Sequence, residues 1–106
     1  MATKDNPGKY DCYAKAAADE PLFTLRAKDP VADSFVAAWV AIRAGDLEDA
    51  KRMMERAAKE LADSGRTLLP RESDKSLEAN QCAKAMYEWR LNQRITACEQ
   101  RLGEVK

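Results

Sequence analysis

The sequence predicts an all-α fold, a small helical domain, and three observations support this prediction. Ala, Leu, Glu, Lys and Arg, which favour helices, dominate the composition, whereas aromatic residues make up only 7% of it. Apolar residues recur every three or four positions along three segments. Glycine and proline stand between these segments, where helices begin or end. We therefore expect an αα-hairpin over about 30–44 and 47–62, followed by a long C-terminal helix over about 74–102.

Length and charge limit the architecture and the classes of function. A chain of 106 residues fits a single helical domain, 1–106, with residues 1–8 as a flexible N-terminus. The 18 basic and 18 acidic residues balance, so overall charge favours neither nucleic-acid nor membrane binding. The first residues lack the pattern of a signal peptide, and no apolar run is long enough to span a membrane. We expect a cytoplasmic protein.

Reactive side chains are scarce. The sequence contains no histidine, which removes the commonest general base. Its cysteines are odd in number and widely spaced, which argues against a disulfide framework and against a zinc site. They are Cys12, Cys82 and Cys98. We expect no catalytic residues, no metal and no cofactor, and hence a protein that is not an enzyme.

The residues before the hairpin predict short elements only. The alanine-rich stretch 10–18 is expected to form a short helical turn. Asp19, Glu20 and Pro21 make a typical helix opening, so 22–27 is expected to be a helix of one or two turns. The apolar residues of 22–27 also alternate, and an extended strap is therefore the alternative.

The hairpin has clear start and stop signals. Asp29 and Pro30 predict the start of its first helix, as N-cap and first helical residue. Gly45 predicts the end of that helix, and Asp46 predicts the cap of the second. A broad apolar face follows Pro30, and we expect it to be buried on more than one side. This face consists of Val31, Phe35, Val36, Trp39, Val40 and Ile42.

The long C-terminal helix has two apolar faces between a cap at Ser73–Asp74 and a stop at Gly103. The first face is expected to pack on its own chain and consists of Cys82, Ala85, Met86 and Trp89. The second face is turned from it by roughly 200° at 3.6 residues per turn. It consists of Leu91, Ile95, Cys98 and Leu102. We expect this second face to form a homo-oligomer interface; a fold-back after a kink near 90–92 is the alternative.

Arginines mark the candidate ligand site. Tyr87, Arg90, Arg94 and Arg101 share one line of the long helix, and Arg66 and Arg71 lie in the loop that precedes it. Guanidinium groups beside an aromatic ring suit a phosphate or carboxylate ligand, and a loop with glycine and hydroxyl groups can add to such a site. The alternatives are a solvent-facing helix side, arginines paired with acids from elsewhere in the fold, and an ordinary linker.

Three stretches resemble small uncharacterised proteins of phages and prophages. They are GKYDCYA at 8–14, DEPLFTLRAKDP at 19–30 followed by Trp39, and AKAMYEW at 83–89, together about a third of the chain. The resemblance brings no activity or site residues with it. It implies a small protein that acts in the host cell cytoplasm during infection, often against host defence.

Two functions follow from these observations. The first is a non-enzymatic phage binding protein, a counter-defence factor that sequesters a nucleotide-like host immune signal as an oligomer. It would use Tyr87, Arg90, Arg94, Arg66 and Arg71 for an anionic small-molecule ligand. The alternative is a protein–protein interaction module that docks on and inhibits a host or phage protein, such as a defence protein. Balanced charge on the second hairpin helix argues against DNA recognition.

Overall fold

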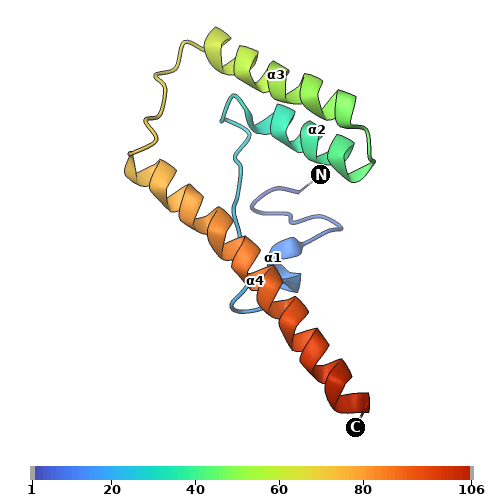
Figure 1. Ribbon diagram of the computed structural model, residues 1–106. Coiled ribbons are helices and arrows are strands. Elements are labelled where there is room, and N and C mark those ends of the chain that lie inside the picture. Colours follow the sequence, from blue (N-terminus) through green and yellow to red (C-terminus); the bar gives the residue numbers. More distant parts are fainter. Residues whose placement is uncertain (1, 106) are drawn as a thin grey trace. The chain divides into compact units, whose positions relative to one another are not determined.

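The computed structural model describes residues 2–105, with side chains to Gly103 (Figure 1). Its described residues form four helices and no strand, which confirms the all-α prediction. The helices are α1 (Cys12–Lys15), α2 (Ala32–Arg43), α3 (Leu47–Asp63) and α4 (Asp74–Val105). None of them combines the length and apolar character needed to cross a membrane.

The chain groups into two compact units. One unit is the segment Thr24–Ser73, which contains α2 and α3. The other combines the N-terminal segment up to Phe23 with α4. The single domain 1–106 stays a prediction.

The α2–α3 hairpin forms as predicted, and its turn satisfies the backbone groups at both helix ends. Gly45 has φ of 81°, and its N–H donates to the Ile42 carbonyl at 3.0 Å. The Asp46 N–H donates to the Ala41 carbonyl at 2.9 Å, which completes a Schellman motif at the end of α2. The Asp46 carboxylate accepts from the Asp49 N–H at 3.0 Å and so caps α3.

The hairpin core is built from small side chains. Its buried residues are Ala32, Ser34, Ala38, Ala41, Ala50 and Ala57. Alanines on both helices let the two backbones approach closely, and the large apolar residues of α2 are left on its other side. Trp39 is 62% exposed and Phe35 is 40% exposed. The predicted burial of the broad apolar face of α2 is therefore wrong for this chain.

The segment leading into α2 differs from its prediction in two respects. The stretch 22–26 has no regular secondary structure, so the short helix does not form. The Glu20 carboxylate turns back to accept from the Ala17 N–H at 3.3 Å, and so closes a turn upstream and caps no helix downstream. Helix α2 begins at Ala32 because Asp29 first closes a turn, with its carboxylate accepting from the Val31 N–H at 3.1 Å.

Helix α4 starts where predicted and continues three residues beyond its predicted end. Gly103 lies inside the helix and has no positive φ, so it does not stop α4. The helix is unbroken through residues 90–92, which excludes the fold-back alternative (Figure 1). Its 32 residues span about 48 Å at 1.5 Å per residue.

The first apolar face of α4 is half-buried, as predicted. Cys82, Ala85, Met86 and Trp89 are all half-buried, and Ala79 extends the row toward the N-terminus. The Cys82 thiol donates to the Leu22 carbonyl at 3.4 Å, which ties this face to the N-terminal segment. The helical turn α1 confirms its prediction and is capped by the Asp11 carboxylate, which accepts from the Ala14 N–H at 3.1 Å.

Candidate functional site

The second apolar face of α4 is exposed along its whole length. Ile95 is 48% exposed, Leu91 and Leu102 are exposed with it, and Cys98 is a free, exposed cysteine. These residues follow one another at intervals of four, three and four, so they form a continuous ribbon on a helix. No described segment of the chain covers this ribbon, which leaves it available to a partner.

The arginine stripe borders that ribbon. At 100° per residue, Tyr87, Arg90, Arg94 and Arg101 centre roughly 80° around α4 from the second apolar face. Tyr87 is 60% exposed, and the three arginines are exposed. Cationic groups and an aromatic ring therefore line one edge of an apolar ribbon.

The guanidinium groups of the stripe are not paired with acids in the described part of the chain. The ion pair described on α4 joins Lys84 and Glu88 at 3.9 Å, and it lies on another side of the helix. No described carboxylate lies within 4 Å of Arg90 or Arg94. The alternative of arginines neutralised within the fold is not seen among these residues.

The loop arginines belong to a different compact unit from the stripe. Arg66 and Arg71 are exposed and belong to the Thr24–Ser73 unit, whereas Tyr87, Arg90 and Arg94 belong to the other. The Ser64 hydroxyl donates to the Leu61 carbonyl at 2.6 Å and accepts from the Arg66 N–H at 3.3 Å. The Ser64 hydroxyl and the Arg66 N–H are thus engaged locally, at the end of α3 and the start of the loop. The structure brings together the three predicted residues of α4 and describes no site that joins all five.

A polar cluster inside the hairpin was not predicted. Ser34 is fully buried, at 0% exposure, and its hydroxyl donates to a Glu60 carboxylate oxygen at 2.6 Å. The Arg56 Nε donates to the Ser34 hydroxyl at 2.9 Å and lies 3.1 Å from the same Glu60 oxygen. Arg56 also lies 3.8 Å from Asp33. The four-residue spacing of Arg56 and Glu60 in the sequence is typical of an ion pair on a helix, but no local pattern indicates that Ser34 of α2 joins them.

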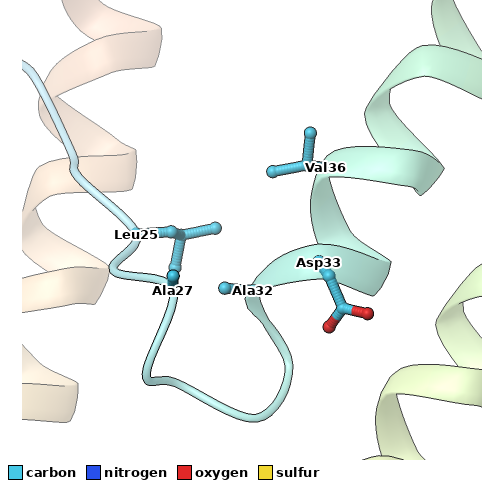
Figure 2. Close-up of a pocket in the computed structure, with 5 residues that line it drawn as sticks. All are labelled: Leu25, Ala27, Ala32, Asp33 and Val36. Atoms are coloured by element: carbon cyan, nitrogen blue, oxygen red, sulfur yellow. The ribbon is translucent and has the colours of Figure 1, made fainter. Parts of the chain in front are cut away.

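A shallow apolar hollow lies beside α2 and was also not predicted. Leu25 and Ala27 of the segment that precedes α2 form one wall, and Ala32, Asp33 and Val36 of α2 form the other (Figure 2). Its volume is about 430 Å³. Asp33 is the charged group in this lining, so the hollow suits an apolar group that carries a positive charge.

Among the described residues, no three Cys, Asp or Glu side chains gather closely enough to hold a metal ion. Comparison with protein-family models gives no match, and neither the curated proteins nor the solved structures include a chain that matches this one.

Proposed function

We propose that this chain is a non-enzymatic binding protein. It assembles with further copies through the second apolar face of α4 and holds an anionic, nucleotide-like ligand at the edge of that interface. The observation that carries the proposal is the position of the Tyr87, Arg90 and Arg94 row beside an exposed apolar ribbon. A ligand site built from two copies needs both features on one helix, because each chain alone offers only one wall.

The chemistry of the row indicates the class of ligand. Arginine forks bind phosphate and carboxylate oxygens through paired hydrogen bonds, and a tyrosine ring stacks on a planar base. Without acidic partners nearby, Arg90 and Arg94 keep their hydrogen-bond donors for a ligand. A nucleotide provides both a phosphate and a base, so it matches the row better than a simple anion does.

The resemblance of 8–14, 19–30 and 83–89 to phage proteins supplies the biological setting of the proposal. A small binding protein can oppose host defence by sequestering a signal. We therefore propose that the chain acts in the host cytoplasm as an oligomeric counter-defence factor that removes a nucleotide-like immune signal.

The test combines mass in solution with ligand binding. Light scattering should give an oligomer for the purified chain, and Ile95→Asp should give a smaller, folded species. Cyclic dinucleotides and ADP-ribose serve as probes in thermal-shift and calorimetric titrations. We expect Arg94→Glu to lower affinity for the bound probe by about tenfold to a hundredfold without changing the mass.

Lys75→Glu is the matched control, because it makes the same charge change on an exposed residue of α4 away from the stripe. It should leave both mass and affinity unchanged. A strictly monomeric chain with no bound nucleotide and no response to these probes would remove the proposal.

A further inference from the structure

The exposed side of α2 is a second apolar surface, distinct from the ribbon on α4. Phe35, Val36, Trp39, Val40 and Ile42 are each at least 40% exposed, and they lie opposite the alanines that pack on α3. Arg43 lies on the same side, with its guanidinium carbon 6.0 Å from the centre of the Trp39 ring. Monomeric proteins rarely leave two large aromatic and three branched residues together in water, which indicates an interface.

The residues of this surface follow a twofold pattern along the helix. Phe35 and Ile42 lie on one flank, Val36 and Val40 lie on the other, and Trp39 lies between them. The midpoint of each of these two pairs along the helix lies within about one residue of Trp39. An antiparallel second copy would therefore place Phe35 on Ile42, Val36 on Val40, and Trp39 on Trp39.

The charges at the two ends follow the same pattern. Asp33 lies near the N-terminus of α2 and Arg43 at its C-terminus, on either side of the same centre. Antiparallel pairing brings the Arg43 of each copy to the Asp33 of the other, twice in one interface. The charges thus complement themselves and favour this register over a parallel one, which would put like charges together.

We propose that the occupant of this surface is a second copy of the chain, paired antiparallel through α2. The hollow beside Val36 receives the Arg43 side chain of the second copy, with its methylene groups against Leu25 and its guanidinium at the Asp33 carboxylate. The Asp33 side chain is 67% exposed beside Arg56, so it can accept this second cation. This pairing does not depend on the α4 assembly or on the proposed ligand.

The test exchanges the charges of Asp33 and Arg43, singly and together, on the full chain. It is done in wild type and in an Ile95→Asp background, which removes the proposed α4 interface. Sedimentation should show dimers of the Ile95→Asp chain with a dissociation constant on the order of micromolar, as expected for a small interface. Asp33→Arg and Arg43→Asp should each weaken dimerisation by about tenfold. The double variant should recover most of the loss, because the two charges exchange places.

Two further variants separate pairing from folding. Arg52→Asp reverses an exposed charge on α3 and should leave dimerisation unchanged. Val40→Asp should abolish dimerisation with unchanged helix content. If Asp33→Arg disturbs folding through Arg56, Asp33→Asn replaces it, because it places no second cation beside Arg56. Asp33→Asn should partly restore dimerisation of the Arg43→Asp chain, because it removes the repulsion between the two carboxylates. A monomer at all concentrations, failure of folded charge-swap variants to recover, or a monomer that instead binds a host protein through Val40 would overturn the pairing.

Discussion

At the scale of single residues, Ser34 shows how a buried hydroxyl can fix the register of two helices. Its hydroxyl donates to the Glu60 carboxylate and accepts from the Arg56 Nε–H, so one side chain of α2 engages two of α3. An alanine at this position would fit the alanine core by size but would make neither hydrogen bond. The hydrogen bonds of Ser34 therefore fix the position of α2 along α3, which contacts between alanines alone do not fix.

We expect Ser34→Ala to lower the free energy of unfolding of the hairpin by about 1 kcal/mol. The loss is limited because Arg56 and Glu60 still lie 3.1 Å apart without the hydroxyl, and because alanine favours helix slightly. Urea unfolding followed by circular dichroism measures the change. Ser64→Ala is the control, since the Ser64 hydroxyl is exposed; a loss as large as that of Ser34→Ala would contradict a role for burial.

At the scale of helices, two glycines in helix-ending positions of the sequence behave oppositely. Gly45 has φ of 81°, and no atom would contact an added Cβ within 4 Å, so Gly45→Ala should cost about 1–2 kcal/mol through backbone strain alone. Gly103 is helical and also has open space, so Gly103→Ala should be neutral or stabilising. Thermal unfolding followed by circular dichroism distinguishes the expected loss of stability in Gly45→Ala from the unchanged or higher stability of Gly103→Ala. A Gly45→Asn variant should recover part of the loss, because asparagine tolerates positive φ; no difference among the variants would contradict this account.

The comparison of these elements shows what sequence patterns can predict. Caps and turns are local, so Asp46 and Gly45 predicted the hairpin correctly. The half-buried face of α4 was also predicted, because Cys82, Met86 and Trp89 recur at helical spacing on one line of the helix. The packed side of α2 was not, because Ala38 and Ala41 carry little apolar weight beside Trp39, and pattern analysis assigns the core to the larger residues. The hydrogen bonds of Ser34 join residues 22 and 26 positions apart, which no local pattern contains.

In the candidate site, too, features set by local spacing could be predicted and those that join distant parts of the chain could not. The shared face of Tyr87, Arg90 and Arg94 on one helix follows from spacing alone, and the structure shows that all three are exposed. The loop arginines were grouped with them because both are cationic, although they belong to a different compact unit. Sequence order gives no distance between units, so only a bound ligand can decide whether Arg66 or Arg71 takes part.

At the scale of the whole molecule, the two proposed self-pairing faces would have a consequence that neither has alone. A chain with one twofold interface stops at a dimer, whereas a chain with two can continue to a closed tetramer or a longer assembly. We expect wild-type mass to exceed that of a dimer. Val40→Asp should leave a dimer joined through α4, Ile95→Asp should leave one joined through α2, and the double variant should be a folded monomer.

Light scattering with circular dichroism on the four proteins measures this series. The four masses are informative because one charge, at Val40 or at Ile95, disrupts one apolar face at a time. Both positions are exposed, so a folded monomer tolerates the charge. A wild-type dimer that either substitution alone converts to a monomer would mean that both faces serve a single interface. In that case the charge pattern of Asp33 and Arg43 would have to be satisfied by α4 of the other copy, and the antiparallel pairing of α2 would be wrong.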